Sequence, residues 1–229
     1  MEESVFENIL IESKKYPIDA VVITGIGEPL LDFGIIEKLK MAKRILDVAV
    51  TIYTNGTNLK KYLKDLLEGG LDSLVISLNT INSEKRKAIM GIDYFDELDE
   101  IIRNWNNNKC NLTICAIPDM GYMERLDYDA MIKKYGKDKM YFHYVSNWGG
   151  QYNFDLKFKP TDACPRPFEI IHVNCDGNFV LCCLDYEGKV SFGKSITEMI
   201  NNETWKYYRK MLSEGKRSEL ELCKNCTTV

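Results

Sequence analysis

The fold is decided by residues 20–29, which read AVVITGIGEP. The first half of this stretch is short, rich in β-branched residues and apolar on both faces, as is typical of a parallel strand that is covered on both sides. In the second half, Gly25 and Gly27 allow the backbone to approach a ligand, Pro29 fixes the turn, and Glu28 places a carboxylate just beyond the strand. The stretch therefore predicts a buried strand that runs into a tight turn or a binding loop for a small molecule.

The same alternation continues to about residue 146. Four more strand-like runs follow, at residues 48–53, 74–78, 112–117 and 140–145, and apolar stripes at helical spacing occupy residues 5–10, 35–46, 59–67 and 95–105. Strand and helix in this order predict right-handed βαβ units. We therefore expect an α/β sheet or barrel whose functional site lies at the carboxyl ends of the strands.

Two further strand ends carry polar residues. The second strand runs into Asn55-Gly56, which is a turn signal, and the third runs into Ser77 and Asn79. Small polar groups at such a place bind a ribose or another polyol, or they cap the helix that begins near Ser83. These residues do not decide between a ligand site and local structure by themselves.

Composition limits the classes of protein to which the chain can belong. Its 229 residues are 45% hydrophobic and 28% charged, which is ordinary globular usage and predicts one large domain or a large and a small one. The net charge of −4 and the lack of a Lys/Arg block argue against nucleic acid as a partner, and no apolar run has the roughly 20 residues that cross a membrane. The acidic, amphipathic N-terminus does not resemble a secretory signal, so we expect a cytoplasmic protein.

Eight cysteines in a cytoplasmic chain favour metal ligation or reactive thiols over disulfides. Six of them fall in the last 66 residues. Asp176-Gly177 between two apolar runs predicts a hairpin, with Cys182 and Cys183 facing opposite ways on the returning strand. The two histidines, His143 and His172, lie in apolar contexts and are expected to be structural.

The spacing of the remaining cysteines predicts a tetrathiolate site. Cys223 and Cys226 form one half of a four-thiolate clamp, and Cys164 with one of Cys182 or Cys183 completes it. Such a set binds a structural zinc ion or a fully ligated iron–sulfur cluster, and the residues alone favour zinc slightly. Unligated buried thiols are the remaining interpretation.

Taken together, these segments resemble the radical S-adenosylmethionine enzymes that carry a C-terminal SPASM/twitch-type auxiliary iron–sulfur domain. Residues 24–30 resemble the GGEP motif that holds the amino group of S-adenosylmethionine, residues 54–57 resemble the motif that ends the next strand, and residues 77–79 resemble the segment that meets the ribose and carboxylate. The cysteine-rich segment from Cys164 to Cys226 resembles the auxiliary-cluster domain. The resemblance covers nearly the whole chain.

The resemblance implies a fold and a set of ligands. It implies a partial TIM-like (β/α) barrel that lacks its first strand, at residues 1–158, and a small Cys-rich α+β cluster domain at residues 159–229. It implies that S-adenosylmethionine is bound by Gly25, Gly27, Glu28, Pro29, Asn55, Ser77 and Asn79. It also moves the choice of metal to a 4Fe-4S cluster bound by Cys164, Cys182, Cys223 and Cys226, with Cys182 matching the family position better than Cys183 and zinc as the alternative.

One departure from the family is serious. The defining CxxxCxxC loop occurs nowhere in these 229 residues, and Cys110 and Cys115 have the wrong spacing for it. We therefore do not expect the chain as given to cleave S-adenosylmethionine. Either the chain is a shortened radical enzyme, or it is a degenerate relative that keeps the barrel and the auxiliary site for binding. The matches at Gly27, Glu28, Ser77 and Asn79 favour the first interpretation.

Two functions follow from this resemblance. With the missing loop supplied, we expect an oxidoreductase or a peptide- or small-molecule-modifying enzyme that uses a 5′-deoxyadenosyl radical. Its partners would be a small-molecule or peptide substrate and an electron-donor protein. The alternative is a non-catalytic module that binds a 4Fe-4S cluster or zinc together with a ligand or peptide.

Overall fold

The structure is a computed structural model of the 229-residue chain, and it describes residues 1–91, 94–116, 125–142, 146–148 and 163–227. The chain separates into two compact units. The sheet unit comprises residues 16–145, and the cysteine-rich unit combines residues 1–15 with residues 146–229. The predicted domain boundary after residue 158 falls outside the described residues and stays a prediction.

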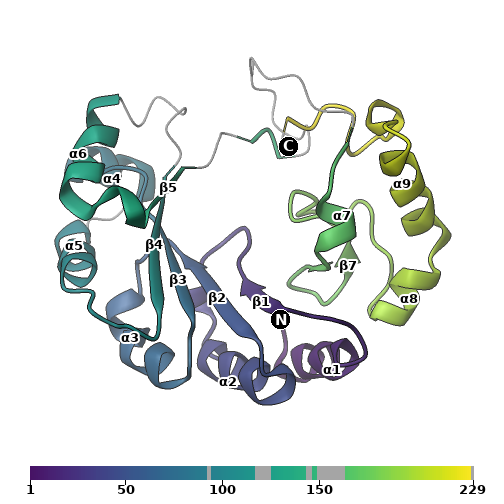
Figure 1. Cartoon of the computed structure of the whole chain (residues 1–229), viewed down its shortest axis with the longest axis horizontal. Helices are drawn as coiled ribbons and strands as arrows, with labels where there is room; N and C mark the ends of the chain where they lie inside the picture. The colour runs from purple at the N-terminus through teal and green to yellow at the C-terminus, as the bar shows by residue number, and fades with distance from the viewer. Residues whose placement is uncertain (92–93, 117–124, 143–145, 149–162, 228–229) are drawn as a thin grey trace. The chain divides into compact units, whose positions relative to one another are not determined.

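The sheet unit is built on a parallel sheet of five strands in the order β1-β2-β3-β4-β5 (Figure 1). These strands are β1 (Ala20–Ile23), β2 (Ala49–Thr54), β3 (Ser73–Ser77), β4 (Asn111–Ala116) and β5 (Met140–Phe142). All five strands match predicted runs, although residues 117 and 143–145 of those runs lie outside the described part. The α/β, partial TIM-like architecture expected from the sequence is confirmed.

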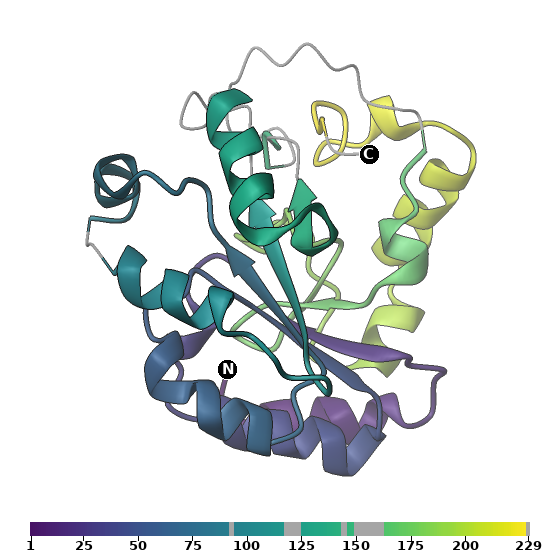
Figure 2. The same ribbon diagram turned by 60° about the vertical axis from the view of Figure 1, so that its left-hand side comes forward.

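Helices connect the strands, and the apolar stripes predicted three of them, α2, α3 and α5. They are α2 (Ile35–Leu46), α3 (Leu59–Glu68), α4 (Ser83–Met90), α5 (Phe95–Arg103) and α6 (Arg125–Tyr135), with the short 3-10 helices η1 (Pro29–Leu31) and η2 (Lys137–Lys139). In Figures 1 and 2, α2 and α3 lie along the same side of the strands. The order of strands and helices brings the ends of β1, β2 and β3 to neighbouring places at one edge of the sheet.

The two faces of the sheet differ in burial. Ile52, Leu74 and Leu112 share one face through the strand register, and all three are buried. The helices bury Leu39, Leu66 and Leu98 to 1% exposure or less, which makes this side the hydrophobic core. The other face is more open, since Val22 is 52% and Tyr141 is 49% exposed.

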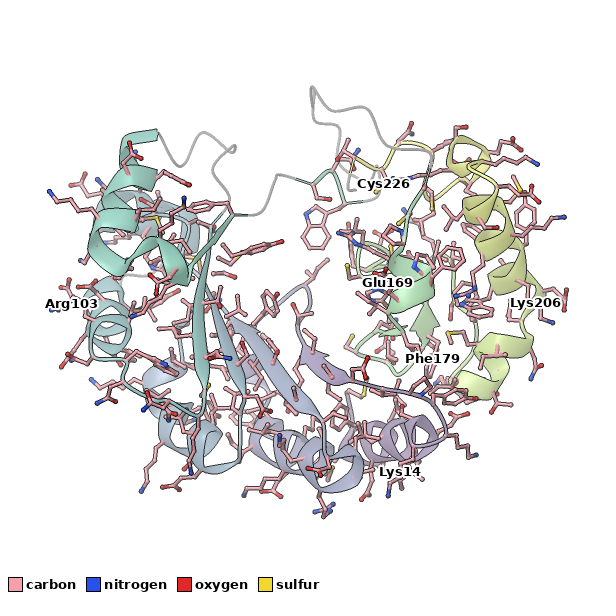
Figure 3. All side chains as sticks on the ribbon, in the orientation of Figure 1. Lys14, Arg103, Glu169, Phe179, Lys206 and Cys226 are labelled. Atoms are coloured by element: carbon pink, nitrogen blue, oxygen red, sulfur yellow. The ribbon has the colours of Figure 1, made fainter. Side chains whose placement is uncertain are left out.

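The cysteine-rich unit contains α1 (Glu3–Ser13), α7 (Arg166–Glu169), α8 (Ile196–Asn201), α9 (Glu203–Ser213), η3 (Arg217–Glu219) and the antiparallel pair β6 (His172–Val173) and β7 (Phe179–Val180). Phe179 points into its interior and is fully buried (Figure 3). The predicted hairpin is present, because Gly177 has φ +80° and its N–H donates to the carbonyl of Asn174 at 3.0 Å. Among the described helices, none combines the length and the apolar character that spanning a membrane requires.

The predicted placement of Cys182 and Cys183 on the returning strand is wrong. β7 ends at Val180, and the chain turns immediately afterwards, since the N–H of Asp185 donates to the carbonyl of Cys182 at 3.1 Å. Asp185 stabilises this loop because its carboxylate accepts from the N–H groups of Lys189 and Val190. The orientation of the two thiols is therefore set by a turn and not by strand alternation.

Candidate cofactor and metal sites

Glu28 joins the ends of two strands. Its carboxylate accepts hydrogen bonds from the N–H of Leu30 at 3.0 Å, the hydroxyl of Thr54 at 2.6 Å and the N–H of Asn55 at 2.7 Å. The first contact caps η1, in which Pro29 is the first residue, and the other two reach the end of β2. Glu28 therefore holds the loops of the site in place, and both of its oxygens are already hydrogen-bonded.

The backbone at Gly25 and Gly27 is open on one side. A Cβ atom built on either glycine meets no heavy atom of the described part of the chain within 4 Å, and both residues are exposed. Gly27 also has φ +126°, a conformation that other residues rarely adopt. The loop after β1 thus leaves the peptide groups of both glycines accessible.

The turn after β2 is fixed by three side chains. The side-chain oxygen of Asn55 accepts from the N–H of Thr57 at 2.9 Å and from its hydroxyl at 2.6 Å. The backbone carbonyl of Asn55 accepts from Nη2 of Arg86 at 2.9 Å and from the hydroxyl of Tyr94 at 3.2 Å. Arg86 is 2% exposed, and sequence reasoning missed this role because a single arginine in a polar helix resembles a surface residue.

Ser77 and Asn79 contrast with Glu28. Both are half-buried at the end of β3, and no hydrogen bond within the described chain uses the Ser77 hydroxyl or the Asn79 amide. Half-buried polar groups of this kind are available to a ligand. The structure thus brings the predicted residues of β1 and β2 together through hydrogen bonds and leaves the predicted residues of β3 open.

In the cysteine-rich unit, all four predicted ligands line one small cavity of about 20 Å³, which we call the thiol cavity. Cys164 precedes α7, Cys182 lies in the turn after β7, and Cys223 and Cys226 follow η3 near the C-terminal end of the chain, where Figure 3 marks Cys226. Cys183 is exposed and does not belong to the lining. The other lining residues are Arg166, Pro167, Leu181, Leu184, Leu212, Arg217 and Leu222.

Burial controls the protonation of these thiols. It raises the pKa of Cys182 and the pKa of Cys223 to about 12. For Cys223 the neighbouring Cys182 acts in the same direction, while the positive charge of Arg217 acts against it. A metal that binds here must displace protons, because the thiolate is the ligand form.

Two residues outside the cysteine pattern hold the last loop of this unit. The guanidinium of Arg217 donates to the carbonyl of Cys226 at 3.0 Å. Asn147 is 6% exposed, donates from its side chain to the carbonyl of Asn225, and accepts from the N–H of Thr227 at 3.1 Å. No pattern in the sequence indicated the role of Arg217.

The donor set is four thiols, which suits a tetrathiolate zinc ion or a 4Fe-4S cluster. Within the described chain, no three His, Cys, Asp or Glu side chains converge as closely as one metal ion requires. A zinc ion needs four sulfur atoms about 2.3 Å from one centre. A 4Fe-4S cluster takes each thiolate on a different iron, so its ligands surround a core. The four thiols line a cavity of about 20 Å³, which is room for about one water molecule, so a cluster would move the surrounding loops apart.

Comparison with known proteins gives relatives of two kinds. Over 104 residues the chain is 36% identical to a probable GTP 3',8-cyclase of Pyrococcus abyssi, but this match covers 45% of the chain and only 32% of that protein. Over 210 residues it is 26% identical to the S-adenosyl-L-methionine-dependent 2-deoxy-scyllo-inosamine dehydrogenase of Niallia circulans, covering 89% of the chain and 70% of the relative. The chain thus spans about a third of the length of the cyclase it matches.

Solved structures show the same fold. BtrN in complex with AdoMet and 2-DOIA superposes with a TM-score of 0.70 at 21% identity and covers the whole chain and 81% of BtrN. Histidine-tagged anSMEcpe with bound AdoMet gives 0.64 at 12% identity, over 99% of this chain and 80% of that one. The family model of the radical SAM superfamily matches residues 2–132, and that of the SPASM iron–sulfur cluster-binding domain matches residues 164–227. The chain therefore belongs to the radical SAM superfamily and carries a SPASM domain.

Proposed function

We propose that the chain supplies the S-adenosylmethionine-binding barrel and the auxiliary 4Fe-4S site of a radical SAM oxidoreductase or small-molecule- or peptide-modifying enzyme. The observation that carries this proposal is the gathering of Cys164, Cys182, Cys223 and Cys226 around one cavity. When bound, the sulfonium cofactor of this family supplies a carbon radical that removes a hydrogen atom from the substrate. The residues of this chain bind and orient the reactants.

The sheet unit would bind S-adenosylmethionine through groups of different kinds. The exposed peptides of Gly25 and Gly27 suit the amino group, because nothing in the described chain fills the space beside them. The Ser77 hydroxyl and the Asn79 amide suit the ribose and carboxylate, since they make no other hydrogen bond within the described chain. Glu28 and Asn55 hold these loops in place rather than contact the cofactor with their side chains.

A small molecule is the favoured substrate class. The relative that aligns with 89% of the chain is named as a dehydrogenase of 2-deoxy-scyllo-inosamine, a small molecule. An auxiliary cluster would accept an electron from such a substrate, and an electron-donor protein would supply the electron that starts the reaction. Exposed and half-buried free cysteines suit a reducing compartment such as the cytoplasm.

A non-catalytic binding module is the second candidate. It is favoured by one observation, the absence of a CxxxCxxC sequence from these 229 residues. Without those three thiolates the chain would hold one metal centre and a nucleoside-like ligand or a peptide, without turnover. The two candidates differ in whether a cluster loop is supplied by sequence upstream of Met1.

The test compares the chain as given with a version extended upstream, both reconstituted anaerobically. We expect about four irons and four sulfides per chain as given, and their loss in Cys182→Ala but not in the control Cys175→Ser, whose thiol is exposed and outside the cavity. The extended version should hold a second cluster and release 5′-deoxyadenosine when given reductant and S-adenosylmethionine. Zinc without iron in the wild-type chain would refute the auxiliary cluster, and a stop codon upstream with no in-frame CxxxCxxC would refute the enzyme.

A further inference from the structure

The thiol cavity carries fixed charge of one sign. Its charged lining residues are Arg166 and Arg217, and the described lining includes no carboxylate. The rest of the lining, apart from the four thiols, is apolar: Pro167, Leu181, Leu184, Leu212 and Leu222. A cavity whose fixed charges are cations in apolar surroundings favours an occupant with net negative charge.

Arg217 is the more deeply placed of the two cations. It is 2% exposed at the start of η3, whereas Arg166 is half-buried and also acts electrostatically on Cys183 and His172. The guanidinium of Arg217 donates to the carbonyl of Cys226 at 3.0 Å. The N–H of Cys226 in turn donates to the carbonyl of Cys223 at 3.0 Å. One buried cation therefore contacts the turn that presents both thiols.

We propose that Arg217 is a positioning residue that also compensates the charge of the metal centre in the thiol cavity. This inference rests on the proposed auxiliary cluster. Four thiolates carry more negative charge than an oxidised 4Fe-4S core carries positive charge, and reduction adds one more electron. A buried cation stabilises the reduced form more than the oxidised form because the reduced form is more negative. Arg217 therefore raises the reduction potential of the cluster and fixes the backbone of Cys226.

The experiment measures the midpoint potential of the anaerobically reconstituted chain by dithionite titration with electron paramagnetic resonance. In Arg217→Gln we expect the equilibrium constant for one-electron reduction to fall about tenfold or more, a shift of about 59 mV to more negative potential. Arg217→Lys should stay near the wild-type potential, because it keeps the charge, but should lose iron to a chelator several-fold faster, because an ammonium lacks the planar fork. The matched control is Arg209→Gln, since Arg209 packs on Phe168 and Trp205 in the same unit without lining the cavity.

The outcomes separate this inference from the function on which it rests. A wild-type chain without iron and sulfide refutes the auxiliary cluster, whatever the variants do. A wild-type cluster with an unchanged potential in a folded Arg217→Gln variant refutes the role of Arg217 alone, as does an equal shift in Arg209→Gln. If Arg217→Gln does not fold, the lysine variant decides, because a tenfold change in its reduction constant or a wild-type rate of iron release contradicts the proposal.

Discussion

Glu28 and Ser77 lie at the same edge of the sheet but do different work. Glu28 accepts three hydrogen bonds, from Leu30, Thr54 and Asn55, whereas the described chain makes no hydrogen bond to the hydroxyl of Ser77. Charge-assisted hydrogen bonds of this kind are stronger than neutral ones. The sequence motifs predict the same role, cofactor binding, for both residues. The hydrogen bonds in the structure distinguish Glu28, which holds the loops, from Ser77, whose hydroxyl is available to a ligand.

We expect Glu28→Gln to lower the free energy of unfolding by about 1–3 kcal/mol. The variant replaces one accepting carboxylate oxygen by an NH₂ group, which is a donor and would face another hydrogen-bond donor. Ser77→Ala should change it by less than about 0.5 kcal/mol and weaken S-adenosylmethionine binding about tenfold, the value of one hydrogen bond. Urea unfolding and equilibrium dialysis measure the two effects. Equal stability of Glu28→Gln and the wild type would show that the three contacts contribute nothing.

His172 gives the cysteine-rich unit a dependence on pH. Burial, with a smaller contribution from the charge of Arg166, lowers its pKa from 6.5 to about 4, and its Nε2 has no hydrogen-bond partner in the described chain. The unfolded chain therefore binds a proton at a higher pH than the folded one, so stability is complete above about pH 6.5 and falls as the pH drops toward 4.

We expect the free energy of unfolding of this unit to decrease by about 2 kcal/mol between pH 7 and pH 5 through His172. His172→Phe should remove this part of the decrease, since it removes the titrating group and keeps an aromatic ring. Urea unfolding at the two pH values measures it. The same slope in the variant and the wild type would assign the pH dependence to other groups.

Site residues were predictable from the sequence where they form a recognisable spacing. The cysteines of the thiol cavity were named from their spacing and from the family resemblance, and all four line it. Arg86 and Arg217 were not named, because each is an isolated arginine whose burial depends on contacts far along the chain. A sequence pattern does not show that an isolated charged side chain becomes buried when the chain folds.

At the scale of elements, the strongly patterned segments were predictable and the weakly patterned ones were not. All five parallel strands and the helices α2, α3 and α5 follow predicted runs. α6 was missed because Arg125–Tyr135 has only a weak apolar stripe, and the extension of β7 to Cys183 was wrong because a turn at Asp185 ends the pairing. The hydrogen bonds of a local turn overrode a pattern that resembled a strand.

The turn between β2 and α3 depends on close packing against α5. Gly56 has φ +86°, and a Cβ atom at this position would lie 2.8 Å from both terminal carbons of Leu98. Gly91 has a similar φ of +74°, but a Cβ atom there would meet no atom of the described residues within 4 Å. Comparing alanine substitutions at Gly56 and Gly91 therefore separates the destabilisation caused by the backbone conformation from the destabilisation caused by the clash with Leu98.

We expect Gly91→Ala to lower the free energy of unfolding by about 1 kcal/mol through backbone strain alone. Gly56→Ala should cost about 1–3 kcal/mol more than that, because Leu98 must move in a packed core. Thermal or urea unfolding of both variants measures the difference. If both variants lost the same free energy of unfolding, the side chain of Leu98 would move aside without an energetic penalty.

At the scale of the whole molecule, the N-terminal helix belongs to the unit formed by the C-terminal half of the sequence. The carboxylate of Glu12 accepts from the N–H groups of Ile196 and Thr197, each at 2.9 Å, and from the Thr197 hydroxyl at 2.7 Å. These bonds cap the start of α8, whose first N–H groups have no partner within the helix. The cysteine-rich unit is therefore closed by residues that are more than 180 positions apart.

We expect Glu12→Gln to destabilise the cysteine-rich unit selectively, by about 1–2 kcal/mol, because a neutral amide replaces a charged acceptor of three hydrogen bonds. Hydrogen exchange should become faster in α8 and around the thiol cavity while the amides of β2, β3 and β4 keep wild-type rates, since the two units hold separate cores. Glu3→Gln is the control, because Glu3 lies exposed in the first turn of the same helix. An equal rise in the strand amides would mean that the chain unfolds as a single cooperative body, and the division into two units would then carry no energetic meaning.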